Sequence, residues 1–130
     1  MSTAKILAVD DEPDFEALLT QRFRRQIRDR EFSFSFAQNG EEALRMLEAD
    51  PEIELMLLDI NMPVMDGLEF IKQLPGVANA KDVPVVMITT EGSESHVAQA
   101  LTCGARGYIR KPFTAEQVKE HVVPVLAGKS

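Results

Sequence analysis

The chain has 130 residues, of which 45% are hydrophobic and 27% are charged, enough for one domain with its own core. Its formal net charge of −7 opposes binding to nucleic acid and to anionic membranes, and no apolar stretch reaches the length of about 18 residues that suggests a membrane span. The N-terminus lacks a secretory signal and Cys103 is the only cysteine, so the sequence predicts a cytoplasmic protein without an intrachain disulfide.

Short apolar runs alternate with segments of helical periodicity along the whole chain. We expect strands at residues 5–9, 32–36, 53–58, 83–89 and 108–110. We expect helices at residues 14–28, 41–48, 66–74, 93–102 and 114–127. This strict alternation predicts a single doubly wound α/β domain, with a five-stranded parallel sheet that helices cover on both faces.

Local signals refine these expectations. Strict alternation at residues 32–36 predicts an edge strand, whereas the apolar run at 53–58 predicts a central one. Asp14 can cap the first helix, and Thr114 and Gln117 form a capping-box pattern at the start of the last. Because Pro124 lacks an N–H, it is expected to bend or end that last helix early.

Polar residues follow four of the five apolar runs. They are Asp10 with Asp11, then Asp59, Thr89 and Lys111. Since the carboxyl ends of parallel strands meet at one edge of a sheet, these side chains should converge where α/β sheets bind ligands. Three carboxylates, a hydroxyl and an amine predict a site for a divalent metal and a phosphoryl group. Strand-end aspartates that merely cap helices or stay solvated are the alternative, which suits one aspartate better than three.

The residue types suggest a reaction. Neighbouring carboxylates repel one another, and Mg²⁺ relieves that repulsion because it favours carboxylate oxygens and retains several waters. Asp59 is the candidate nucleophile, since a carboxylate can attack phosphorus to form an acyl phosphate. Lys111 can place a positive charge on a phosphate oxygen, and Thr89 can donate a hydrogen bond to another. No general base is evident at these strand ends, which predicts a long-lived phosphoaspartate.

Four motifs carry a resemblance that covers the whole chain: V-D-D-E-P, D-I-N-M-P-V-M-D-G, I-T-T and K-P-F. They resemble the response-regulator receiver domains of two-component signalling, the CheY-like family. The resemblance implies a receiver domain over residues 1–130, with the flavodoxin-like fold and strand order 2-1-3-4-5. It also implies a signalling domain rather than an enzyme, one that catalyses only its own phosphorylation and dephosphorylation.

The resemblance further implies a metal site. Asp59 would be the phosphoacceptor. Mg²⁺, with Mn²⁺ as a substitute, would be bound by Asp11, Asp59 and the backbone carbonyl of Asn61. Asp10 would contact the ion through water.

The same resemblance implies a conformational switch. Thr89 and Tyr108 would form the switch pair, Lys111 would bind the phosphate, and the peptide bond before Pro112 would be cis. Phosphate would draw the Thr89 hydroxyl inward and leave room for Tyr108 to follow. One residue departs from the family pattern, because Thr90 stands where a small residue, most often alanine, is usual.

The expected partners also follow from the resemblance. The phosphodonor would be a sensor histidine kinase or a histidine phosphotransfer protein. An unidentified downstream protein would bind the face formed by the helix at 93–102, the strand at 108–110 and the helix at 114–127. Homodimerisation through that face is compatible with the family, and no direct contact with nucleic acid or membrane is expected.

Two other classes of protein compete with this interpretation. Phosphohydrolases of the haloacid-dehalogenase type also form an aspartyl phosphate, but they use a second aspartate two residues after the nucleophile, where this chain has Asn61. A degenerate receiver acting as a pure interaction module would be expected to lack one of the acidic pair, the acceptor or the lysine. This chain keeps all of them.

A run of arginines remains outside this assignment. It lies in the first predicted helix and comprises Arg22, Arg24, Arg25, Arg28 and Arg30. A solvated helix face is the simpler interpretation. The alternative is a docking surface for an acidic partner helix, and DNA binding is the least favoured because no recognition motif flanks the run.

Overall fold

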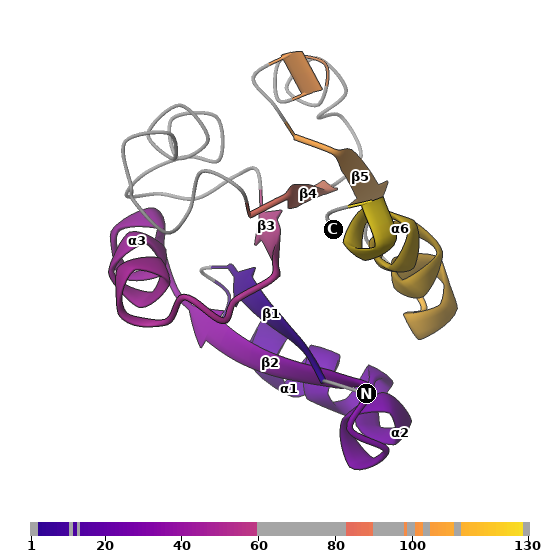
Figure 1. Ribbon diagram of the computed structural model, residues 1–130. Coiled ribbons are helices and arrows are strands. Elements are labelled where there is room, and N and C mark those ends of the chain that lie inside the picture. The colour runs from indigo at the N-terminus through magenta and orange to yellow at the C-terminus, as the bar shows by residue number, and fades with distance from the viewer. Residues whose placement is uncertain are drawn as a thin grey trace.

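The computed structural model describes residues 3–10, 12, 14–59, 83–89, 98, 101–102, 105–110 and 113–128. Its strands form one parallel sheet in the order β2-β1-β3-β4-β5 (Figure 1), which confirms the predicted fold. The strands are β1 Ala4–Val9, β2 Phe32–Ala37, β3 Leu55–Asp59, β4 Val85–Thr89 and β5 Gly107–Arg110.

Every expected helix with described residues is found at least in part, and the first is divided in two. They are α1 Asp14–Arg22, α2 Arg24–Arg28, α3 Gly40–Ala49 and α6 Ala115–Gly128. The helix expected at 66–74 lies outside the described residues, and of the helix expected at 93–102 only residues 98, 101 and 102 are described, all helical. Among all the residues that the structure describes, no helix is long and apolar enough to cross a membrane.

Two apolar layers hold the sheet between the helices. On one face, Ala43 and Leu47 of α3 pack against a cluster that includes Val9 and Leu58. On the other face, α1, Phe23 and α6 pack against residues of β1, β3, β4 and β5, and α3 and α6 lie on opposite sides of the sheet in Figure 1. β3 is buried along its whole length and β2 lies at the edge, as their sequences predict.

The first helix is broken, which corrects the prediction of one continuous helix over residues 14–28. α1 ends at Arg22, and α2 begins at Arg24 after Phe23, whose φ is −103° and ψ is 20°. The Phe23 ring is fully buried and lies 5.9 Å from the ring of Phe32 and 5.2 Å from that of Phe34. Burial of this aromatic ring against β2 accompanies the break, which no Gly or Pro signals in the sequence.

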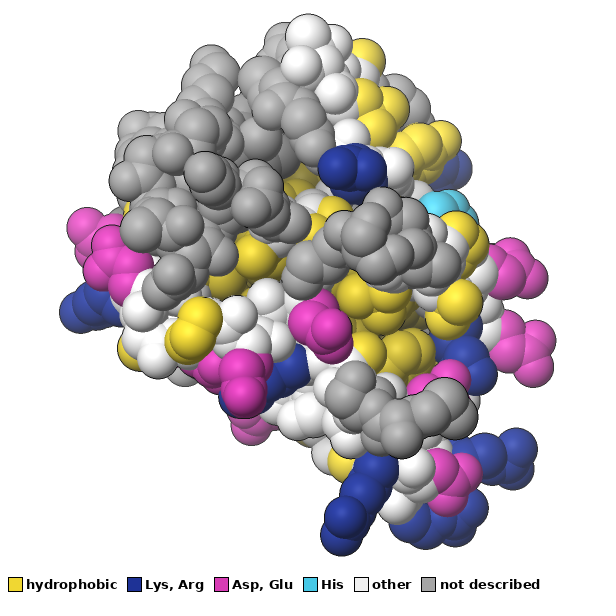
Figure 2. All heavy atoms as spheres, viewed as in Figure 1, with side chains coloured by type: hydrophobic (Ala, Val, Ile, Leu, Met, Phe, Trp, Pro, Cys, Tyr) yellow, Lys and Arg dark blue, Asp and Glu magenta, His cyan; other side chains and the backbone are white. Residues whose placement is uncertain are grey.

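The arginine run covers the second half of this broken helix. All five of its arginines are exposed. Figure 2 shows Lys and Arg side chains gathered over α2, at the lower right of the view.

Two helices, α3 and α6, begin with side-chain capping bonds. The Asn39 side chain accepts a hydrogen bond from the backbone N–H of Glu42 at the start of α3. At the start of α6, the backbone N–H of Thr114 donates to Gln117 Oε1 at 2.9 Å, and the N–H of Gln117 donates to Thr114 Oγ1 at 3.2 Å. The predicted capping box is therefore confirmed.

Pro124 does not end the last helix, which was one of the two outcomes expected from the sequence. α6 continues through it to Gly128. Val122 is fully buried before the proline, and Val125 and Leu126 pack against the core after it. These apolar contacts on both sides of Pro124 hold the helix on the sheet and offset the lost hydrogen bond.

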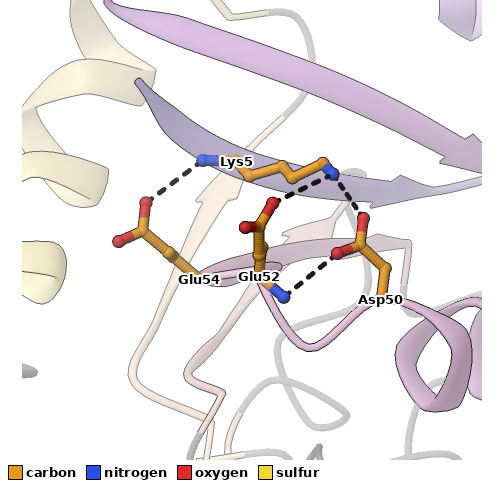
Figure 3. A network of polar contacts seen from close by, with 4 residues as sticks. All are labelled: Lys5, Asp50, Glu52 and Glu54. Carbon is orange, nitrogen blue, oxygen red and sulfur yellow. Dashed lines mark hydrogen bonds and ion pairs between the residues drawn. The ribbon is translucent and has the colours of Figure 1, made fainter. Parts of the chain in front are cut away.

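A polar network ties the start of β1 to the loop before β3 (Figure 3). The Lys5 ammonium lies 2.5 Å from Asp50 Oδ2 and 3.9 Å from Glu52 Oε2. The Lys5 backbone N–H donates to Glu54 Oε2 at 3.2 Å, and its carbonyl accepts from the N–H of Glu54 at 2.8 Å. The hydrogen bond with Lys5 lowers the pKa of Asp50 below its ordinary value of 3.8, and the same bond raises the pKa of Lys5 above 10.5.

Replacing Asp50 with asparagine is expected to flatten the acid side of the stability profile. Because the pKa of Asp50 is lower in the folded state, its contribution is complete above about 3.8 and is lost as the pH falls further. Urea unfolding from about pH 6 to about pH 3 should show the gap between wild type and Asp50→Asn closing at the acid end. Glu52→Gln is the control, since Glu52 is more exposed and further from Lys5. A constant gap would contradict the assignment.

Candidate functional site

Two carboxylates lie at neighbouring strand ends. Asp10 directly follows β1 and Asp59 is the last residue of β3. The register pairs Val9 with Leu58, so Asp10 and Asp59 are the next residues along the same two strands. Because side chains alternate across a sheet, this register places both carboxylates on the face that α1 and α6 cover.

Both carboxylates are buried, at 5% exposed for Asp10 and 6% for Asp59. Among the residues whose exposure is described, no other charged side chain is buried. The backbone N–H of Asp10 donates to the carbonyl of Ala37 at 3.1 Å, and its Oδ1 accepts from the N–H of Glu12 at 2.9 Å. Aspartate side chains are seldom this deeply buried, and here two of them lie at the ends of adjacent strands.

A cavity of about 320 Å³ lies beside Asp10. Three further carboxylates line it, those of Glu12, Glu16 and Glu42, together with the ring of Phe36. They come from the loop after β1, from α1 and from α3. This acidic lining favours cations. It was not evident from the sequence, because Glu42 is far along the chain from Glu12 and Glu16.

The residues predicted as the switch lie on β4, which neighbours β3, and on the edge strand β5. The register pairs Asp59 with Ile88, so Thr89 is the next residue of the adjacent strand. The register pairs Met87 with Tyr108, and Thr89 at the end of β4 with Arg110. Tyr108 is 45% exposed and lines a hollow of about 570 Å³ with Leu101 and His121. Thr89 therefore lies on β4 two residues after Met87, the residue that pairs with Tyr108.

Another aromatic contact joins the K-P-F motif to the first helix. The ring of Phe113 packs edge-on against that of Phe15 with centroids 6.4 Å apart, and both rings are buried. The K-P-F motif alone predicts no role for this phenylalanine. Its apolar character after a strand end was the available signal.

The remaining predicted site residues lie outside the described part of the chain. They are Asp11, Asn61, Thr90, Lys111 and Pro112. The described residues alone include no group of three or more His, Cys, Asp or Glu that could hold a metal ion.

The order of the strands and the acidic edge agree with a known family. The family model of the response regulator receiver domain matches residues 6–123. The chain belongs to the response regulator receiver domain family. This membership makes it a signalling domain of two-component response regulators, as the motifs predict, and not a classical enzyme.

Individual receiver proteins match nearly the whole chain. A chemotaxis protein CheY homolog of Campylobacter jejuni is 34% identical over 126 residues, covering 97% of this chain and 95% of its own. The structure of chemotaxis protein CheY4 of Vibrio cholerae has 31% identity and a TM-score of 0.81, covering 95% of this chain and 99% of that one.

A third likeness concerns the fold alone. The receiver domain of sensor histidine kinase PA1611 from Pseudomonas aeruginosa is 21% identical with a TM-score of 0.82, covering 97% of this chain and 99% of that one. That structure has a magnesium ion coordinated in its active site cleft.

Proposed function

We propose that this receiver domain, over residues 1–130, is a phosphoacceptor whose Asp59 receives a phosphoryl group from a phosphohistidine. The pair of buried carboxylates at adjacent strand ends, Asp10 and Asp59, carries the proposal. An Asp59 oxygen attacks phosphorus, the bond from phosphorus to the histidine nitrogen breaks, and an acyl phosphate remains on Asp59. The donor is a sensor histidine kinase or a histidine phosphotransfer protein.

The donor set fits Mg²⁺, with Mn²⁺ as a substitute. Asp10 and Asp59 supply hard oxygen atoms from neighbouring strands, and Asp11 and Asn61 stand beside them in the sequence. When bound, the ion would neutralise charge on the transferring phosphoryl group. Asp11, Asp59 and the carbonyl of Asn61 would hold it directly, with Asp10 acting through water, and the carboxylates of Glu12 and Glu42 would favour entry of the cation.

Phosphorylation would then act through a shift of populations. Lys111 and Thr89 would bind the phosphate oxygens, with the peptide before Pro112 in the cis form. Tyr108, which is 45% exposed, would turn inward. Its movement would remodel the surface of residues 93–102, β5 and α6, where the downstream protein or a second copy of the chain would bind.

The proposal is tested by forming the adduct with a small donor. The chain is incubated with Mg²⁺ and acetyl phosphate or beryllofluoride, and the intact mass and amide NMR shifts are recorded beside Asp59→Asn. An adduct that requires both Mg²⁺ and Asp59 is expected. Asp29→Asn is the control, since Asp29 is exposed directly after α2 and pairs with Arg28.

Two results would contradict the proposal. One is an adduct that survives Asp59→Asn. The other is a folded wild type that accepts phosphate neither from these donors nor from a phosphorylated histidine phosphotransfer protein. Steady turnover of a phosphomonoester would instead support a phosphohydrolase.

Thr90→Ala is expected to exchange phosphate faster than the wild type. Thr90 directly follows β4 beside the proposed phosphate ligand Thr89, and its larger side chain should slow the entry of donor and water. The rates of labelling by acetyl phosphate and of loss of the phosphate are compared by intact mass. Equal rates in the two proteins would rule out this role for Thr90.

A further inference from the structure

The exposed arginines of α1, α2 and the turn after α2 form a surface that the proposed phosphotransfer does not use. This arginine patch comprises Arg22, Arg24, Arg25, Arg28 and Arg30. It concentrates five of the 14 basic residues of a chain whose net charge is −7. Figure 2 shows the resulting positive region over α2.

The described residues neutralise the patch poorly. Arg28 Nε lies 3.4 Å from Asp29 Oδ1, and both side chains are mostly exposed, so this pair contributes little. Glu31 is engaged by Lys119 of α6 at 3.0 Å. Within the described part of the chain, the other four arginines form no ion pair. Such clustering of like charges costs free energy unless an anion relieves it.

The backbone beneath the patch is fixed. Phe23 anchors the start of α2 in the core, and the N–H of Glu31 closes the end of the helix by donating to the carbonyl of Gln26 at 2.8 Å. Arg30 has a φ of 60°, a left-handed conformation that favours glycine or asparagine. Because the helix is anchored at both ends, it presents the patch at little further entropic cost.

The patch lies at the edge of the sheet where the strands begin. The N–H of Ala4 at the start of β1 donates to the carbonyl of Glu31, next to Arg30, whereas Asp10 and Asp59 stand at the opposite ends of their strands. A partner on the patch would therefore leave the acidic site accessible. It would also leave Tyr108 accessible, since Tyr108 lies in the surface formed with α6.

The charge and spacing of the patch indicate the chemistry of its partner. Guanidinium groups bind carboxylates through paired hydrogen bonds, and Arg24 and Arg28 are one helical turn apart in α2. An extended polyanion such as DNA or an anionic membrane would also meet the acidic remainder of the chain. We propose that the arginine patch is a docking surface for an acidic protein helix, occupied whether or not Asp59 is phosphorylated.

The experiment uses the ¹⁵N-labelled full chain and a synthetic helical peptide as the probe. The peptide has about 20 residues, long enough to be helical, with glutamates four residues apart. Amide shifts confined to residues 22–30 are expected. Arg24→Glu with Arg28→Glu should weaken binding by about tenfold or more. The matched control, Arg45→Glu with Arg106→Glu, reverses two exposed arginines elsewhere and should change binding less than about twofold.

Further arms separate the alternatives. Asp59→Asn should bind the acidic peptide as tightly as the wild type does. If Arg24→Glu with Arg28→Glu fails to fold, Arg24→Gln with Arg28→Gln takes its place. The proposal is overturned if the peptide does not bind, if the control pair loses as much affinity as the patch pair, or if binding requires phosphorylated Asp59. It is likewise overturned if a DNA duplex or a vesicle containing phosphatidylserine binds more tightly than the peptide.

Discussion

Mg²⁺ at about a hundred times its dissociation constant is expected to raise the free energy of unfolding of the wild type by about 2.7 kcal/mol. The reason is that the proposed ligands come from neighbouring strands and assemble only in the folded chain. Asp59→Asn should lose most of this increase, because the variant removes one buried anionic ligand. Urea unfolding with and without Mg²⁺, and again after adding a chelator, measures the effect.

The control for this experiment is Asp50→Asn. Asp50 lies in the network with Lys5 at the opposite edge of the sheet, so the variant should keep the full response to Mg²⁺ even if its baseline stability changes. A wild type indifferent to Mg²⁺, or an equal response in Asp59→Asn, would remove the metal from the proposed function while leaving the family assignment intact.

Leu57→Ala is expected to lower the free energy of unfolding by about 2–5 kcal/mol. Leu57 is fully buried in β3, where the register places it between Ala8 of β1 and Val86 of β4. Shortening this side chain leaves a cavity in the core beside β3, which has a neighbouring strand on each edge. Since domains are stable by only about 5–15 kcal/mol, this one change removes a large part of the total.

Leu101→Ala provides the matched control, because it makes the same chemical change at a residue that is 42% exposed. Its cost should stay within about 0.5 kcal/mol. Both variants are compared with the wild type by urea unfolding at the same pH and without Mg²⁺. Similar losses from the two substitutions would mean that the centre of the sheet relaxes around the deletion.

The sheet was predictable because each strand has a recognisable local pattern of apolar residues. The run before Asp59 is apolar without interruption, and β3 is central and buried as expected. Parallel strands also bring their carboxyl ends together, so the meeting of Asp10 and Asp59 follows from their positions in the sequence. The glutamates around the cavity were not predictable in this way, since α1 and α3 bring them there only through tertiary packing.

The helices show where local patterns fail. Helical periodicity continues through Phe23, yet contacts with Phe32 and Phe34 accompany a break at that residue. Conversely, Pro124 gives a clear stop signal that the apolar contacts of Val122 and Val125 override. In both cases residues distant in the sequence decide the outcome, and a window of neighbouring residues does not contain that information.

The order of the strands also bears on how the chain is made. β2, β1 and β3 are neighbours in the sheet and all lie within the first 59 residues. As the chain leaves the ribosome from its N-terminus, these three strands can pair, and Asp10 and Asp59 can meet, before β4 is synthesised. Until β4 arrives, the apolar β3 presents an open edge, so this interval of translation is when the nascent chain most needs protection from aggregation.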